Sequence, residues 1–165
     1  MKLPARRVLA AILVLAMPLP AVAQAVAGPS ASPLPGVSVV LAPDSLRDLP
    51  RRTVTVTDEH GTSATYAGAD VEAVLARAGA TAGSAMRGPA LAQYVVVRGA
   101  DGYRAVFALA ELDPGFTDRV VLLADRRDGQ PLPARLGPYQ VVVPGEKRNA
   151  RWVRNVVEID IRSAP

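Results

Sequence analysis

The sequence contains no cysteine and only one histidine among its 165 residues. Without thiolates the chain forms no disulfide and has neither a cysteine nucleophile nor the sulfur ligands of structural zinc sites. The histidine, His60, lies in a Glu59-His60-Gly61 segment whose composition is typical of an exposed turn. We therefore predict no metal site and neither a zinc nor a haem cofactor. A catalytic triad could use only His60.

The glycine-rich signatures of nucleotide binding and the serine nucleophile elbow are also missing. Two acidic pairs, Asp58-Glu59 and Asp125/Asp128, fall short of the ligand density of a calcium loop. These absences argue against a nucleotide-binding enzyme, a serine hydrolase of the nucleophile-elbow type and a calcium-loop protein.

Long apolar runs are absent except near the N-terminus. There, Lys2, Arg6 and Arg7 precede the run VLAAILVLAMPLP, which ends at a small-residue AVA site. This pattern predicts a signal peptide over residues 1–23 and a periplasmic or secreted protein without a membrane span after cleavage. The Arg6-Arg7 pair leaves general secretory and twin-arginine export both open.

The net charge of +4 does not indicate a nucleic-acid partner. The predicted signal peptide carries three of these positive charges and no acidic residue, so only +1 remains for the rest of the chain. No regular basic stripe with interleaved aromatic residues appears either.

The remaining chain predicts a Pro-, Ala- and Ser-rich flexible linker over residues 24–36 and a single domain over residues 37–162. Alternating Val and Thr in RTVTVTD, residues 52–58, are typical of a half-buried strand. Two apolar runs around Gly99–Gly102 predict a hairpin. An apolar stripe between Asp70 and Gly79 predicts a helix. About seven strands and one firm helix indicate an α+β domain, dominated by β-structure in a mixed sheet.

One segment, GPYQVVVPGEKRNARWVRN, joins a buried strand to a basic loop after Pro144-Gly145. The cations Lys147, Arg148 and Arg151 lie within five residues of each other. Such a cluster is either a solvated turn or a binding site for an anion, and composition leaves both interpretations open.

Four blocks of the sequence together resemble the oxidoreductase molybdopterin-binding domain, the catalytic domain of sulfite oxidases and periplasmic methionine-sulfoxide reductases. They are TYAGADVEAVLARAG, GYRAVFAL, LLADRRDGQPLP and GPYQVVVPG…ARWV, and they occur in the family's order. The resemblance implies the sulfite-oxidase-type fold, oxidoreductase activity and a molybdopterin cofactor. It covers nearly the whole chain after the linker.

The resemblance also implies site residues. Tyr103 falls where the family keeps an active-site tyrosine. Cofactor-binding positions are implied at Asp125, Arg126, Lys147, Arg148 and Arg151.

Two departures from the family pattern stand out. The cysteine that ligates molybdenum in the family has no counterpart, and Gln140 replaces an arginine. Two hypotheses follow. The chain is either an exported oxidoreductase-like domain that binds a pterin or other anionic ligand, or a non-catalytic periplasmic module for a small anion or a partner protein.

Overall fold

The computed structural model describes residues 36–58 and 61–164. The predicted signal peptide, almost all of the predicted linker and the Glu59-His60 pair lie outside these residues. None of the helices in the described part has the length and apolarity needed to cross a membrane.

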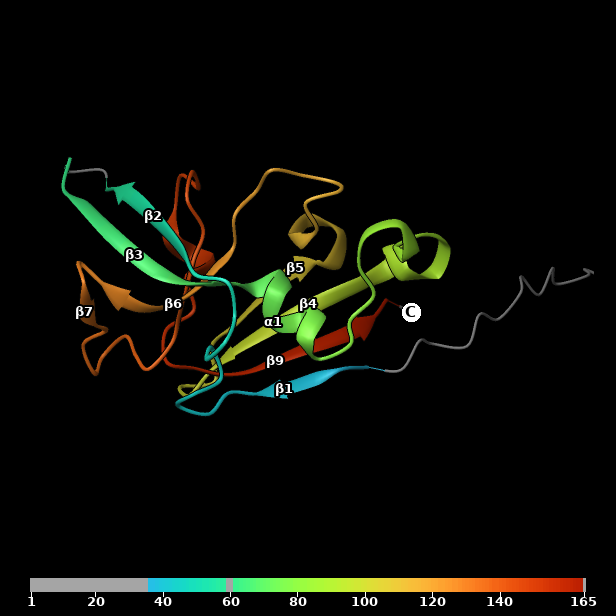
Figure 1. Ribbon diagram of the computed structural model, residues 1–165, viewed down its shortest axis with the longest axis horizontal. Coiled ribbons are helices and arrows are strands. Elements are labelled where there is room, and N and C mark those ends of the chain that lie inside the picture. Colours follow the sequence, from blue (N-terminus) through green and yellow to red (C-terminus); the bar gives the residue numbers. More distant parts are fainter. Residues whose placement is uncertain (1–35, 59–60, 165) are drawn as a thin grey trace, which may run out of the picture. The chain divides into compact units, whose positions relative to one another are not determined.

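The first sheet is four-stranded and antiparallel, in the order β1-β9-β4-β5 (Figure 1). Strands β4 and β5 form the predicted hairpin, with Val96 opposite Val106. Strand β9 is the long C-terminal strand and pairs with both β4 and β1. The strand bounds are β1 Ser38–Val40, β4 Gln93–Gly99, β5 Arg104–Ala108 and β9 Val156–Ser163.

The second sheet is five-stranded, with β2, β3, β6 and β7 in order and β8 added beside β6. The alternating Thr and Val residues of β2 pair antiparallel with β3, and β3 pairs with β6. The strand bounds are β2 Arg52–Thr57, β3 Ser63–Asp70, β6 Leu122–Arg127, β7 Gln130–Pro131 and β8 Gln140–Val142.

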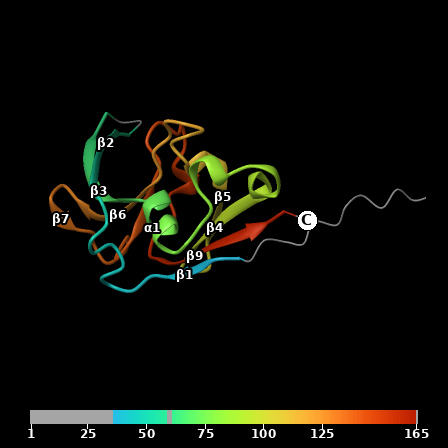
Figure 2. The same cartoon turned by 45° about the vertical axis from the view of Figure 1, so that its right-hand side comes forward.

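The α-helix α1 (Val71–Arg77) follows β3 directly and lies against the first sheet (Figures 1 and 2). Its apolar stripe, Val71, Val74 and Leu75, is buried in the larger core cluster together with Phe107 and Ile159. Burial of this stripe supplies most of the stability of so short a helix. Four 3₁₀ helices complete the described elements: η1 Gly83–Ala85, η2 Gly88–Ala92, η3 Leu109–Leu112 and η4 Asn149–Arg151.

A β-bulge interrupts the pairing of β3 with β6. Ala67 is opposite Arg126, but the next residue, Gly68, is opposite Ala124, so Asp125 is the extra residue on β6. An extra residue reverses which side chains face a given side of the sheet. The bulge therefore places Arg127 directly opposite Tyr66.

The prediction of a β-dominated α+β domain is confirmed. The hairpin and the helix lie where the sequence places them, and the segment after the hairpin forms 3₁₀ helix η3. The division of the strands into two antiparallel sheets was not predicted, because alternation within a strand does not reveal its partners.

Candidate functional site

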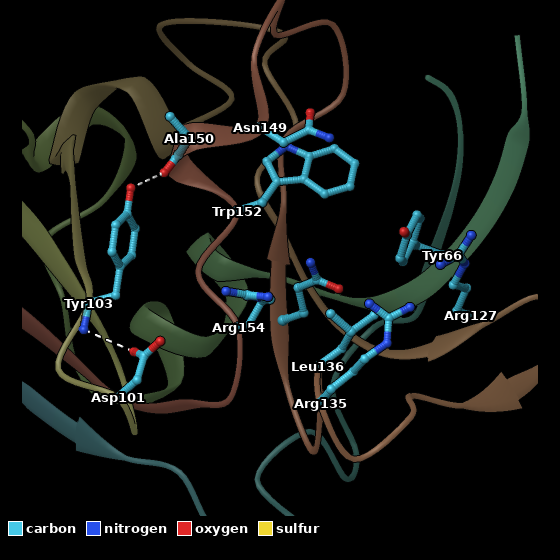
Figure 3. Close-up of a pocket in the computed structure, with 11 residues that line it drawn as sticks. Tyr66, Asp101, Tyr103, Arg127, Arg135, Leu136, Asn149, Ala150, Trp152 and Arg154 are labelled. Carbon is cyan, nitrogen blue, oxygen red and sulfur yellow. Dashed lines mark hydrogen bonds between the residues drawn. The ribbon is translucent and has the colours of Figure 1, made fainter. Parts of the chain in front are cut away.

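A cavity of about 470 Å³ is lined by residues from the second sheet, from the β4–β5 turn of the first sheet and from the loops around β8 (Figure 3). One wall comes from the β4–β5 turn, another from β3 and the end of β6, and a third from the segment around η4. The lining residues are Tyr66, Asp101, Tyr103, Arg127, Arg135, Leu136, Gln140, Asn149, Ala150, Trp152 and Arg154.

Two aromatic rings form part of the wall. Tyr66 and Trp152 pack edge to face, with ring centroids 5.6 Å apart and ring planes at 87°. The guanidinium carbon of Arg127 lies 5.7 Å from the centroid of the Tyr66 ring. The Trp152 indole N–H donates to the Val143 carbonyl at 3.3 Å, which fixes the orientation of the indole ring.

Three arginines and one aspartate give the lining of the cavity a net positive charge. Arg135 and Arg154 are exposed, and no carboxylate of the described residues forms an ion pair with either. Arg127 is half-buried, with its Nε 3.3 Å from Asp128 Oδ2. Asp101 accepts a hydrogen bond from the Tyr103 backbone N–H at 2.9 Å. A wall of guanidinium donors of this kind suits an anionic ligand.

Two buried polar atoms in the wall lack a hydrogen-bond partner among the described residues. They are Gln140 Oε1 and Arg127 Nε, whose contact with Asp128 is an ion pair without a hydrogen bond. Gln140 is only 5% exposed. Because neither atom has appreciable accessible surface, both lie within the wall and neither offers a contact to a ligand in the cavity.

Tyr103, the predicted catalytic residue, lines this cavity. Its hydroxyl donates to the Ala150 carbonyl at 2.6 Å and so connects the β4–β5 turn to the η4 segment (Figure 3). The side chain is about half exposed. The structure thus brings Tyr103 to the cavity with its hydroxyl hydrogen already donated.

The predicted ligand-binding residues on β6 lie away from the cavity. Asp125 accepts a bidentate pair from Arg51, and this hydrogen bond raises the pKa of the Arg51 guanidinium. Arg126 donates to the Gly129 carbonyl at 3.4 Å within the β6–β7 turn.

Arg151 lies in an ion-pair network rather than in the cavity wall. Its guanidinium donates to Glu111 Oε1 at 2.9 Å and to Glu146, and its Cζ lies 4.4 Å above the Phe107 ring centroid. Burial disfavours the charged form, but the hydrogen bonds that the guanidinium donates to Glu146 and Glu111 outweigh it and raise the Arg151 pKa. Arg119 also contacts Glu111 at 3.2 Å. The network holds the chain after Pro144 against β5 and η3.

Lys147 and Arg148 are exposed and do not line the cavity. Of the basic cluster in this loop, the structure therefore engages Arg151 with carboxylates and leaves its two neighbours at the surface. The cation of the same segment that does reach the cavity is Arg154.

A family model described as the oxidoreductase molybdopterin binding domain matches residues 41–165. The chain belongs to this family. The match runs from the end of β1 to the C-terminus and so includes every residue of the cavity wall. No curated protein matches the chain significantly.

Several cavity residues escaped the sequence analysis. Arg127 was passed over in favour of Arg126, because the bulge at Asp125 that turns Arg127 toward Tyr66 has no visible signal in the sequence. Gln140 was recognised in the sequence as a replacement of a family arginine, but it was not predicted to be a site residue. Arg135 offered no signal at all.

The residues present fit the organic part of the family's molybdopterin cofactor and do not fit its metal. The arginines and the aromatic pair suit a planar or anionic organic group. The metal does not fit in the family's way, because the whole chain has no cysteine to supply a thiolate. Nor do the described residues gather three His, Asp or Glu side chains for a metal.

Proposed function

We propose that this chain is a sulfite-oxidase-type molybdopterin-binding domain that binds a small anionic ligand in the arginine-lined cavity. In this proposal it does so without the thiolate-held metal chemistry of its family. A pterin is the first ligand to consider because of the family, and any small oxyanion meets the same donors. The predicted export would place this binding outside the cytoplasm. The intact mass of the purified protein tests the export, since removal of the predicted signal peptide leaves a chain that begins at Gln24.

The observation that carries the proposal is the composition of the cavity wall. Arg127, Arg135 and Arg154 supply guanidinium donors, and Asp101 is the carboxylate among the lining residues. Guanidinium groups bind carboxylates and phosphates through paired hydrogen bonds, and they remain charged at any physiological pH. A net positive cavity also attracts anions before contact.

The residues argue against oxo transfer as the activity of this domain. A thiolate tunes the metal in a way that neither Thr nor Asp can reproduce, and none is available. The Tyr103 hydroxyl hydrogen is donated to the Ala150 carbonyl. In the proposal Tyr103 shapes the cavity by holding the η4 segment in place.

Titration calorimetry of the chain with sodium phosphate and with sodium sulfate tests the proposal. At least one of these anions should bind the parent. Arg135→Gln combined with Arg154→Gln should weaken that binding about tenfold or more, which corresponds to ~1.4 kcal/mol. Both arginines are exposed, so their loss should leave the free energy of unfolding nearly unchanged.

Lys147→Ala combined with Arg148→Ala is the matched control, since it removes the same charge from outside the cavity. We expect it to change the affinity by less than about twofold at moderate salt, because exposed charges beyond the cavity are screened. If the control lowered affinity as much as the cavity variant, the basic loop would be the binding site. If neither anion bound the parent, the proposal would fail.

A further inference from the structure

Strand β2 forms an open edge of the second sheet. It stands at the end of the strand order, and among the described residues it pairs with β3 alone. Figures 1 and 2 both show it at the margin of the domain. Its six residues pair with β3 without a bulge, and none of them is a proline. A regular strand edge of this length can pair with a strand of another chain, and proteins usually protect such edges.

The other sheet edges that the structure describes are short or covered. Strand β1 has three residues, and β7 has two, one of which is a proline. The edge of β5 is covered by Arg151, which donates to the Val106 carbonyl at 3.3 Å. The Val141 backbone N–H of β8 donates to the Val153 carbonyl. Among these edges, β2 is the one that is both long and regular.

The peptide groups of every second residue of β2 face the open edge. The Thr65 N–H of β3 donates to Asp128 Oδ1 at 2.8 Å, and the Thr65 carbonyl accepts from the Asp128 N–H at 2.7 Å. Both groups of Thr65 thus point away from β2, so Thr65 and its opposite residue Thr55 form a non-hydrogen-bonded pair. The peptide groups of Thr55 therefore point outward, and the alternation along the strand extends this to Thr53 and Thr57.

The sequence of this edge is complementary to itself. From Arg52 to Asp58 it reads RTVTVTD, in which TVTVT is the same in both directions and the two ends carry opposite charges. Two copies that pair antiparallel about a twofold axis at Thr55 place this residue opposite its own copy. Val54 then lies opposite Val56, and Arg52 lies opposite Asp58. This register also pairs the outward peptide groups of all three threonines with one another.

We infer that the chain forms a symmetric dimer through its β2 strands, in the register that places Thr55 on the twofold axis. The partner is a second copy of this chain, and the second sheets of the two copies become one continuous sheet. The inference is independent of the proposed anion binding, because no residue of β2 lines the cavity.

The side chains of the strand favour this pairing. Val54 and Val56 are partly buried against the core residues of the second sheet, and their copies extend this apolar face across the axis. Arg52 and Asp58 are exposed, so their pairs at the two ends of the strand select the register more than they add affinity.

The interface is small, so the dimer should be weak and reversible. A single strand edge buries less surface than the roughly 1,200 Å² at which standard-sized interfaces begin. We therefore expect a dissociation constant of about 10–100 µM.

The test is sedimentation equilibrium of the purified chain between about 5 and 500 µM, a range over which the parent should change from monomer to dimer. Thr55→Lys places two ammonium groups opposite each other on the axis and should weaken the dimer about tenfold or more. Thr55→Glu should do the same with two carboxylates. In an equimolar mixture of the two variants opposite charges meet, so association should return to about the strength of the parent.

Thr65→Lys is the matched control. Thr65 lies beside Thr55 on the same face, with the two hydroxyl oxygens 3.2 Å apart, but it is one strand farther from the axis. Its copies would be three strand spacings apart, about 14 Å, which exceeds the Debye length of about 8 Å at physiological salt. We expect this variant to change the dissociation constant less than about threefold.

The mixture also separates a lost interface from a lost fold, because a variant that failed to fold would not be rescued by its counterpart. A parent chain that stayed monomeric at about 500 µM would overturn the inference. So would a dimer that survived both Thr55 variants, or a Thr65→Lys effect as large as theirs. Failure of the mixture to associate would contradict the register with Thr55 on the axis.

Discussion

Gly68→Ala should destabilise the domain by about 3 kcal/mol or more, the largest effect that we expect from a single methyl group. A Cβ on Gly68 would lie 2.0 Å from the Leu123 carbonyl oxygen and 2.7 Å from the Ala124 Cα. Both are backbone atoms of the neighbouring strand β6, so no side-chain rotation can relieve the clash. Urea unfolding followed by circular dichroism measures the loss.

Ala67→Gly is the control for this substitution. Ala67 lies on the other side of the same bulge, and its loss removes one methyl group and adds backbone freedom at a cost of about 0.5–1 kcal/mol. A Gly68→Ala protein within about 1 kcal/mol of the parent would show that β3 and β6 do not approach as closely as described. The bulge that positions Arg127 would then be in doubt.

Arg151→Met should cost about 2 kcal/mol of stability at pH 7. The side chain keeps its apolar contact with Phe107 but leaves Glu111 and Glu146 with Arg119 as their one shared cation, 3.2 and 3.9 Å away, and the side chains of Arg151, Glu111 and Glu146 are less than one third exposed. Removing one of the two cations leaves two partly buried carboxylates to share a single positive charge. Thermal unfolding at several pH values measures the loss.

The pH dependence identifies the cause of this loss. Acid removes carboxylate charge and with it the repulsion between two carboxylates that share one cation, so the deficit of Arg151→Met should be smaller in acid than at pH 7. Arg148→Met is the matched control, because Arg148 is an exposed neighbour, and it should stay within about 0.5 kcal/mol of the parent. A deficit independent of pH would mean that packing, rather than charge, holds the loop.

Much of the fold could be predicted because its signals are local. Val54 and Val56 alternate with threonines along β2, and the apolar stripe of α1 shows the period of a helix. The turn at Gly102, where φ is +83°, separates the two strands of the hairpin as its composition indicates. Each of these patterns is set by residues a few positions apart.

The site was harder to predict because its geometry depends on contacts between distant segments. The bulge at Asp125 decides that Arg127, rather than Arg126, faces Tyr66. In the sequence Arg151 is as good a candidate for anion binding as its basic neighbours. In the structure it is paired with Glu111, which is forty residues away in sequence. Tyr103 was predicted as a catalytic residue by family resemblance, and its position in the cavity wall and its hydrogen bond to Ala150 became visible only in the fold.

The central claim is that this member of the molybdopterin-binding family keeps the fold and an anion-binding cavity without a thiolate-held metal. The most direct test is the molybdenum and pterin content per chain, by elemental analysis and by fluorescence after oxidation, in protein purified from a host that makes the cofactor. We predict molybdenum far below one atom per chain, with or without bound pterin. One molybdenum atom per chain, retained through purification, would contradict the claim.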